Sequence, residues 1–151
     1  MITFHVESFR QSLPEFEPLL PLHWAELALN QDKVPLKPQW NLYFQREDAG
    51  ELLFVAAREE GKIVGYFIGF VSPGLHYETC LTCIMDIMFI QKDKRIGTAG
   101  IRLFKFVETE LVRRGVQRWF VGSKVYADAS ALFERLKFTK TEVFYSKWIG
   151  E

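Results

Sequence analysis

The chain lacks an excess of charge of either sign. Its 151 residues include 19 Lys and Arg and 19 Asp and Glu. A protein that binds a nucleic-acid backbone needs a basic surplus to displace counterions, so the composition argues against nucleic acid as the partner. The sequence also lacks an apolar run of the roughly 18 residues that cross a bilayer, and its first residues lack the basic-then-apolar order of a secretion signal. We predict a cytoplasmic protein with no membrane partner.

Cysteine is scarce as well. Cys80 and Cys83 are the only two. They lie in an apolar stretch typical of a strand, where residues three apart point to opposite faces. No second pair of cysteine or histidine residues is placed to complete a tetrahedral zinc site. We expect two buried, reduced thiols and no metal.

Apolar residues are plentiful, at 48% of the chain against 25% charged. These values and the length are typical of one globular domain, here residues 1–151. Pro14, Pro18 and Pro21 are expected in first helical turns, because proline in a helix interior removes a hydrogen bond. The hydrophobic pattern predicts strands over residues 3–9, 52–58, 63–71, 81–90, 119–126 and 138–149. It predicts two short helices before residue 30, helices over 39–48, 98–114 and 127–136, and a loop over 72–79.

Charge is divided unevenly along the chain. Residues 1–60 hold ten acidic and five basic side chains, whereas residues 91–124 hold nine basic and three acidic ones. The second segment therefore has the charge to hold a small polyanion. A solvated basic helix face is the alternative explanation.

The strongest motif is a basic, glycine-bearing loop between a predicted strand and a predicted helix. It reads Lys94-Arg95-Ile96-Gly97-Thr98-Ala99-Gly100. Small residues in such a loop let several backbone N–H groups point at one anion, and the helix dipole adds a partial positive charge there. The spacing matches neither of the two standard nucleotide-binding fingerprints. We interpret the loop as a pyrophosphate cradle of another type.

In this context the chain resembles the GCN5-related N-acetyltransferase (GNAT) family. That family's phosphate loop is Arg/Gln-x-x-Gly-x-Gly/Ala, and residues 94–99 are similar to it, with lysine in the leading basic place. Residues 86–89 resemble the acidic and apolar strand end that precedes the loop in the family. Residues 129–138 resemble its later Ala-x-x-Leu-Tyr-x-x-Leu-Gly-Phe signature, and the order of elements covers the whole chain. More narrowly, the His76-Tyr77 loop and the Ser123-Lys124-Val125 strand end are similar to small GNAT proteins of phages and prophages.

The resemblance implies an α/β domain of three layers, α/β/α. Its mixed, mostly antiparallel sheet would contain one parallel pair that splays apart at the cofactor site. Acetyl-CoA is the implied cofactor, with its pantetheine arm bound by the main chain of Ile87, Met88 and Phe89. The implied pyrophosphate site consists of Lys94, Arg95, Ile96, Gly97, Thr98, Ala99 and Gly100.

The sequence departs from the family at the usual catalytic acid. Where a tyrosine commonly protonates the departing thiolate, this chain has Phe133, and it has Val121 where some members carry a glutamate base. Asp86 is the candidate base, because burial in an apolar strand raises the pKa of a carboxyl group. A carboxylate that binds loop amides is the alternative. Tyr126 is a candidate substitute for the missing acid.

Four further side chains complete the predicted site. His76 is a catalytic candidate, because histidine titrates near neutrality, and Tyr77 is a candidate for binding the acceptor. Both could instead anchor their loop. His23 and Glu26 lie in the first helical region, which walls the acceptor site in the family, although a solvated helix face would also explain them. Three aromatic residues could line the pocket but are assigned to the core: Trp40, Tyr43 and Phe44.

These features favour an acetyl-CoA-dependent N-acetyltransferase, of enzyme class EC 2.3.1, that transfers acetyl directly to a primary amine of a small molecule or peptide. The relatives implied by the resemblance often pair as homodimers. The alternative is a GNAT-fold protein that binds coenzyme A or serves in phage assembly and has lost transfer, which Phe133 and Val121 favour. A nucleobase-modifying acyltransferase is a third hypothesis, and the acidic first half of the chain counts against it.

Overall fold

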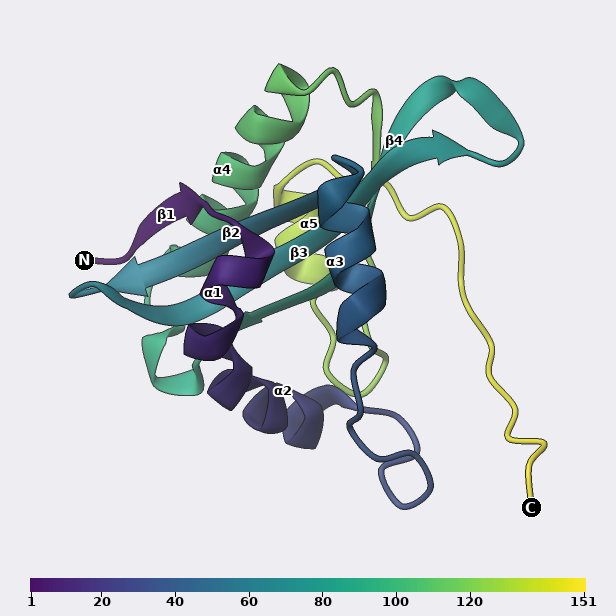
Figure 1. The fold of residues 1–151 in the computed structure, drawn as a ribbon. Coiled ribbons are helices and arrows are strands. Elements are labelled where there is room, and N and C mark those ends of the chain that lie inside the picture. The colour runs from purple at the N-terminus through teal and green to yellow at the C-terminus, as the bar shows by residue number, and fades with distance from the viewer.

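The computed structural model describes residues 1–151 and contains one five-stranded sheet in the order β1-β2-β3-β4-β5 (Figure 1). Neighbouring strands are antiparallel except for β4 and β5, which are parallel. This arrangement confirms the predicted mixed sheet with a single parallel pair. The strands are β1 Thr3–Val6, β2 Leu52–Glu59, β3 Lys62–Gly74, β4 Tyr77–Ile90 and β5 Arg118–Phe120.

Helices cover both faces of the sheet and make the predicted three layers (Figure 1). One face is covered by α1, α2 and α3, and the other by α4 and α5. The helices are α1 Phe9–Phe16, α2 Leu20–Leu27, α3 Trp40–Asp48, α4 Ala99–Arg113 and α5 Ser130–Arg135, with short 3-10 turns at Glu17–Leu19 and Lys92–Lys94.

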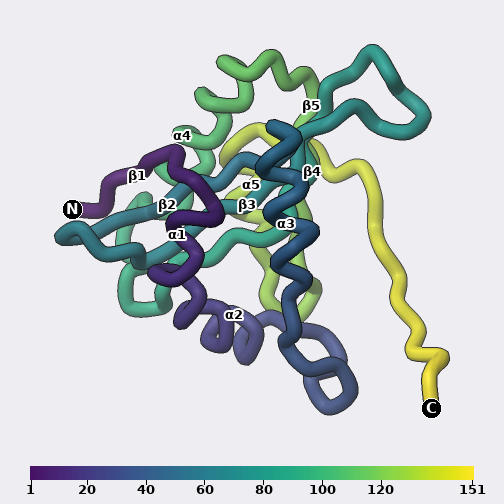
Figure 2. Tube along the Cα trace, in the orientation of Figure 1, coloured from purple at the N-terminus to yellow at the C-terminus, as the bar shows by residue number.

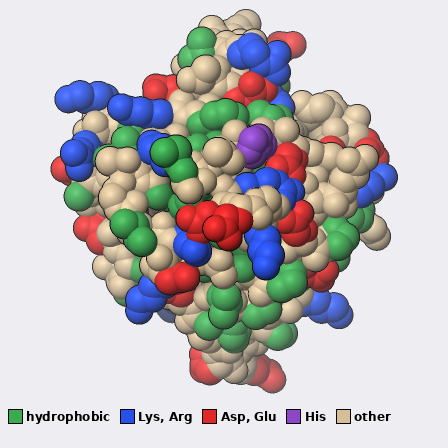
Figure 3. Space-filling view, turned by 90° about the vertical axis from the view of Figure 1, so that its left-hand side faces the viewer, with side chains coloured by type: hydrophobic (Ala, Val, Ile, Leu, Met, Phe, Trp, Pro, Cys, Tyr) green, Lys and Arg blue, Asp and Glu red, His purple; other side chains and the backbone are tan.

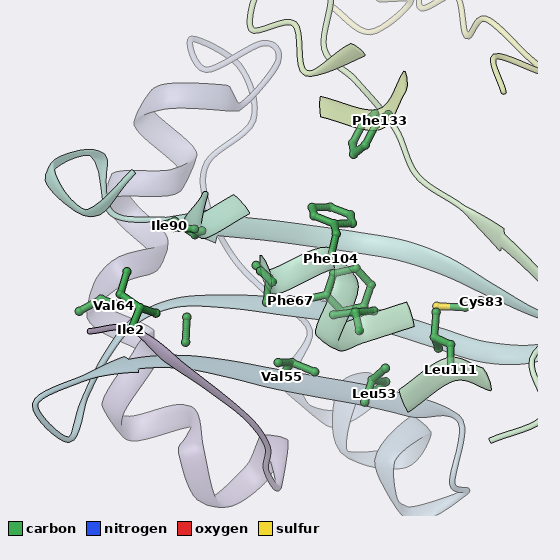
Figure 4. Packing of buried hydrophobic residues seen from close by; sticks show 14 of the residues in the cluster. Ile2, Leu53, Val55, Val64, Phe67, Cys83, Ile90, Phe104, Leu111 and Phe133 are labelled. Atoms are coloured by element: carbon green, nitrogen blue, oxygen red, sulfur yellow. The ribbon is translucent and has the colours of Figure 1, made fainter. Parts of the chain in front are cut away.

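Each face has its own apolar cluster. On the α4 side, Phe104 stacks on Trp119 and meets Phe133 edge-on, with ring centroids 5.5 Å apart in both pairs. Figure 4 shows Phe133 and Phe104 beside each other on this side of the sheet. On the α1 side, Phe9 is fully buried and stacks on Tyr43 at 5.0 Å. Because aromatic rings fill both layers, most of the chain's aromatic content is core, as the sequence predicted.

Helix α1 contradicts the expected position of one proline. Pro14 lies inside the helix, not in its first turn. The helix ends two residues later, and Pro14 is exposed, so the Arg10 carbonyl that loses its N–H partner is accessible to water. The start of α1 is strongly capped, because the Glu47 carboxylate accepts hydrogen bonds from the backbone N–H groups of Phe9 and Arg10.

The β3–β4 hairpin also differs from the prediction. Residues 72–79 were expected to form a loop, but β3 and β4 continue pairing until Gly74 and Tyr77. The sheet therefore extends past the core as a two-stranded ribbon, and Leu75 at its tip is fully exposed. The predicted β2–β3 hairpin, with its turn at residues 59–62, is confirmed.

The predicted last strand, residues 138–149, is absent. Phe138 packs against Trp119 and Phe133, but the chain beyond it runs free of the sheet with its side chains exposed (Figure 2). The predicted strand at 119–126 is also shorter, since only Arg118–Phe120 pairs with β4. A strand needs a partner edge, and three residues of β5 offer very little of one. Strand propensity alone therefore gave the wrong result here.

Candidate active site

A cavity of about 480 Å³ lies where the two halves of the chain meet. It is lined by 25 residues, of which 17 are hydrophobic, from α1, α2, α3, the loop between α2 and α3, β3, β4 and the segment 122–133. Met85 and Met88 on its wall pack with the α4-side cluster, whereas Ile87 packs with the α1-side cluster. The lining therefore comes from both sides of the sheet, so the cavity passes through the sheet beside the end of β5.

Strand β4 contains an irregularity at Asp86. Ile87 pairs with Ile68 and Met85 pairs with Gly69, which leaves Asp86 as the extra residue of a β-bulge. A bulge interrupts the alternation of a strand and re-aims the side chain at that position. As a result, the consecutive residues Asp86 and Ile87 both face the α1 side, and Asp86 lines the cavity.

The Asp86 carboxyl is half-buried and has one side-chain partner. The Tyr43 hydroxyl donates a hydrogen bond of 2.5 Å to Asp86 Oδ2. Burial raises the pKa of Asp86 above its ordinary value, and the bond from Tyr43 offsets part of this rise. The alternative role predicted for Asp86, tying down loop amides, is wrong, because no backbone N–H donates to this carboxylate.

Beyond Ile84 the edge of β4 is open. The parallel ladder joins Thr82–Ile84 to Arg118–Phe120 and then stops, while β4 continues to Ile90. Over residues 85–90, β4 is paired with β3 alone. The main chain of Ile87, Met88 and Phe89 therefore lies at an unpaired edge of β4, past the point where β5 ends at Phe120.

The start of α4 presents a group of unpaired amides. The backbone N–H groups of Ile96, Gly97, Thr98, Gly100 and Ile101 have no acceptor within the chain, and no side chain caps the helix. Gly97 has φ +63°, a left-handed conformation that disfavours other residues. Unpaired N–H groups at the N-terminus of a 15-residue helix are able to bind an anion such as a phosphate group.

The basic side chains of this loop are less available than the sequence indicated. Arg95 makes a two-pronged ion pair with Glu26 at 2.5 and 2.8 Å and also donates to the Ile90 carbonyl. Lys94 is paired with Glu59. The basic second half and the acidic first half thus partly neutralise each other across the fold. Figure 3 shows the result on the side that carries the β2–β3 hairpin, where acidic and basic side chains are mixed without a large patch of one sign.

Of the two predicted residues of the first helical region, His23 lines the cavity and Glu26 does not. His23 lines the cavity, stacks on Phe89 at 5.0 Å and shares a 2.9 Å hydrogen bond with the Tyr66 hydroxyl. Burial lowers the pKa of His23 to about 4, so the ring is neutral at pH 7. Glu26 does not line the cavity, because its carboxylate is bound to Arg95.

Three predicted site residues lie elsewhere. His76 and Tyr77 are exposed at the tip of the β3–β4 ribbon, and Asp86 is nine positions further along β4 than Tyr77, a distance of about 30 Å in an extended strand. Tyr77 instead stacks against Arg118. Tyr126 is outside the cavity lining, and its hydroxyl donates to the Leu27 carbonyl at 2.7 Å. The structure therefore does not bring His76, Tyr77 or Tyr126 to Asp86.

Other predictions have mixed outcomes. Phe133 lines the cavity, as the resemblance implied, and has no hydroxyl to donate. Val121 packs in the α4-side cluster. Cys83 is buried, and burial raises the pKa of its thiol to about 12, but Cys80 is partly exposed, so only one of the two thiols is buried as expected. No group of three or more metal-ligating side chains occurs.

The sequence analysis allowed Trp40 and Tyr43 to line the pocket but assigned them to the core, and it did not find the pairing of Tyr43 with Asp86. Trp40 and Tyr43 do pack in the α1-side core, but both also line the cavity, and Tyr43 is the partner of Asp86. Their spacing of three residues, on one helix face, was the available signal. Lys37 and Lys124 also line the cavity and were not among the predicted site residues.

Searches against known proteins found similarity in structure alone. No protein-family model and no curated protein matches the sequence. An aminoglycoside acetyltransferase from an uncultured soil metagenomic sample superposes with TM-score 0.76 at 16% identity, covering 99% of each chain. A ribosomal-protein-alanine N-acetyltransferase from Brucella melitensis biovar Abortus 2308 has TM-score 0.76 at 18% identity, covering 100% of this chain and 99% of its own. A "predicted acetyltransferase with acetyl-CoA" from Clostridium acetobutylicum has TM-score 0.67 at 12% identity, covering 99% of this chain and 97% of its own.

These likenesses establish the fold. The chain has the architecture of solved acetyltransferases over its whole length, in agreement with the three-layer domain expected from the GNAT resemblance. At this level of identity the acceptor of one protein does not carry over to another. None of the helices has the length and apolar character that crossing a membrane requires.

Proposed function

We propose that this protein is an N-acetyltransferase of the GNAT family that transfers acetyl from acetyl-CoA directly to a primary amine. The observation that carries the proposal is the position of Asp86. This half-buried carboxyl has a raised pKa and lies on the wall of a cavity that reaches the open edge of β4. The fold shared with solved acetyltransferases supports the proposal.

The residues present fit acetyl-CoA. The unpaired amides at residues 96–98, 100 and 101 match a pyrophosphate, and the open main chain of residues 87–89 matches an extended amide-bearing arm. When bound, acetyl-CoA would supply a thioester carbonyl and a thiolate leaving group. In this proposal the backbone of the loop, more than Lys94 and Arg95, holds the phosphates, since both side chains have carboxylate partners.

Asp86 would act as the general base. A primary amine is protonated at neutral pH and becomes a nucleophile only after it loses that proton. The Asp86 carboxylate accepts the proton at an oxygen that the Tyr43 hydroxyl leaves free, while the bond to Oδ2 keeps the carboxylate oriented. A raised pKa suits this role, because a base works best when its pKa approaches the working pH.

Direct transfer is favoured over an acyl-enzyme because the cavity lacks an activated nucleophile. The Ser123 hydroxyl, on the wall, donates to Asp128 and accepts from the Ala129 N–H, with no histidine beside it. Cys83 is buried away from the cavity with a pKa near 12, so its thiol stays protonated at neutral pH. The chain's part in the reaction is therefore to position the amine and accept its proton.

Calorimetry with acetyl-CoA tests the first half of the proposal. Absence of binding at millimolar ligand would overturn it. Thiol release in the presence of mixed polyamines, amino acids and peptides tests the second half. Release above the rate without amine supports transfer, and Asp86→Asn should abolish most of it while acetyl-CoA still binds.

Phe133 favours a second candidate, a protein that binds coenzyme A without transfer. No hydroxyl stands at that position to protonate a departing thiolate, and the ring packs against Phe104 and Phe138. Binding of acetyl-CoA without amine-dependent thiol release would support this candidate. Phe133→Tyr restores the hydroxyl, and a rise in thiol release in this variant would instead identify an enzyme limited by its missing acid.

A further inference from the structure

We infer that the acceptor is a primary monoamine attached to an apolar body, and that polycationic amines are poor substrates. The inference rests on the proposed function, because it concerns the amine whose proton Asp86 accepts. It is carried by two independent features of the cavity, which are its charge and its exposed apolar wall.

The cavity offers one anionic group and two cations. Asp86 is the only acidic residue of the lining, and Lys37 and Lys124 are its lysines. Neither lysine belongs to any ion pair of the structure. A second ammonium group on the acceptor would therefore meet uncompensated positive charge instead of a carboxylate.

Two carboxylates on the helices beside the cavity are already bound. Glu26, one helical turn from His23, is held by both guanidinium nitrogens of Arg95. Glu47 on α3 accepts from the backbone of Phe9 and Arg10 at the start of α1. Neither side chain is free to pair with an added cation on the acceptor. Within the lining, Asp86 is thus the one carboxylate that can bind an ammonium group of the acceptor.

The loop between α2 and α3 forms an apolar wall. Leu29, Val34 and Leu36 line the cavity and yet are 49%, 43% and 40% exposed. Trp24 and Trp40 line it as well. Single exposed aliphatic side chains are normal when they are scattered over a protein surface. When several of them gather around one cavity, they indicate a surface that an apolar ligand covers. The body of the acceptor should therefore be apolar.

Two matched pairs of amines test the two features separately. 2-Phenylethylamine and ethylamine differ by a phenyl group, and we expect kcat/KM to be about 10- to 100-fold higher for the former, because the ring is buried against the wall. Pentylamine and 1,5-diaminopentane differ by one ammonium group, and we expect pentylamine to be preferred by about 10-fold or more. Equal or reversed preference within either pair would overturn the inference.

A variant of the wall should move the selectivity. Leu36→Glu adds a second carboxylate beside the cavity and should raise kcat/KM for 1,5-diaminopentane relative to pentylamine by about fivefold or more. Leu36→Gln matches the change in shape without the charge and should leave this ratio unchanged. Leu22→Glu, on an exposed α2 position outside the cavity, controls for the change in net charge. The inference fails if Leu22→Glu alters the ratio as much as Leu36→Glu does.

Binding measurements separate this inference from the proposed function. Trp24 and Trp40 lie on the wall, so amine binding can be followed by tryptophan fluorescence without any transfer. If acetyl-CoA binds and thiol is released only with 1,5-diaminopentane, the monoamine inference is wrong and the enzyme assignment stands. If no amine releases thiol but pentylamine still quenches fluorescence at lower concentration than 1,5-diaminopentane, transfer is refuted and the binding preference stands.

Discussion

The two halves of β4 differ in their strand partners and in whether they border the cavity. In the first half, Tyr77–Ile84, the strand pairs with β3 at Tyr77 and at Leu81–Ile84, and its last three residues also pair with β5. In the second half, Met85–Ile90, it has β3 on one side, an open edge on the other and a bulge at Asp86. Only the second half borders the cavity.

The difference shows what an open edge and a bulge add to a strand. Where β4 is paired on both sides, its backbone groups are occupied and its side chains only pack. Where β5 turns away, main-chain groups become available to a ligand, and the bulge sets a carboxyl beside them. The polar residues at the other end, His76 and Tyr77, lie on the exposed ribbon and do not line the cavity.

Substitution of Asp86 should give the largest contrast between the halves. Asp86→Asn removes the proposed base, so we expect turnover to fall about 10²- to 10⁴-fold with acetyl-CoA affinity unchanged. Glu78→Gln makes the same chemical change in the first half of β4, where the side chain is exposed, and should leave turnover unchanged. Thiol release and calorimetry measure the two quantities. Equal loss of turnover in both variants would contradict the comparison.

The second effect concerns His23, which packs on Phe89 in the second half of β4. The folded protein keeps His23 neutral down to a pKa of about 4, whereas the unfolded chain takes up the proton near pH 6.5. The contribution of neutral His23 to the free energy of unfolding is therefore fully present above pH 6.5 and is lost as the pH falls to 4. The loss in free energy of unfolding should be up to about 3 kcal/mol.

Urea denaturation at several pH values measures this loss. His23→Gln should remove most of the pH dependence between 6.5 and 4, and His76→Gln, at the exposed tip, should keep it. A wild-type free energy of unfolding that is flat over this range would show that His23 is not held neutral.

A smaller effect is expected from glycine substitutions at the two ends of α4, which distinguish a loss of acetyl-CoA binding from backbone strain. Gly97 and Gly115 stand at the two ends of α4 with φ +63° and +80°, and a Cβ at either would touch nothing within 4 Å. Alanine at either should cost about 1–2 kcal/mol of stability through backbone strain. Only Gly97→Ala should also weaken acetyl-CoA binding, by about tenfold, because it disturbs the unpaired amides. Calorimetry that finds equal losses of affinity in both variants would refute the phosphate site.

The smallest effect is expected from Tyr43. Tyr43→Phe removes the hydrogen bond that lowers the pKa of Asp86, so this pKa should rise further. The acidic limb of the profile of kcat/KM against pH should move to higher pH, with a loss of about three- to tenfold at pH 7. Tyr77→Phe, at the other end of β4, should leave the profile in place. An unshifted limb in Tyr43→Phe would mean that the limb does not report Asp86.

Local patterns predicted the main elements of the fold well. The β2–β3 hairpin, the long buried strand and the apolar face of α4 follow from period-2 and period-3.6 patterns that tertiary packing then preserved. The prediction of a last strand over residues 138–149 was wrong because a strand also needs a partner, and β5 ends at Phe120. The prediction of a loop over residues 72–79 was wrong for the converse reason, because pairing across the β3–β4 hairpin continued past the end of the core.

For the site, the sequence predicted individual residues better than the side chains that they contact in the fold. Asp86 stood out as a charge in an apolar run, and the loop at residues 94–100 as an anion site before a helix. The partners of Lys94 and Arg95 were not predictable, because Glu59 and Glu26 are distant in sequence and meet them only in the fold. The same holds for Tyr43, whose hydroxyl reaches Asp86 across 43 residues of chain.

The sequence by itself determined that this chain builds a mixed α/β domain with a glycine-bearing loop before a helix and an acidic residue inside a buried strand. These features depend on local periodicity and on residues adjacent in the chain. The tertiary structure alone decided that β5 diverges from β4, that a bulge turns Asp86 toward Tyr43, and that the loop's basic side chains are partly neutralised. Strand register, burial and long-range charge pairing arise only when distant segments pack, and they convert a conspicuous carboxylate into a candidate base.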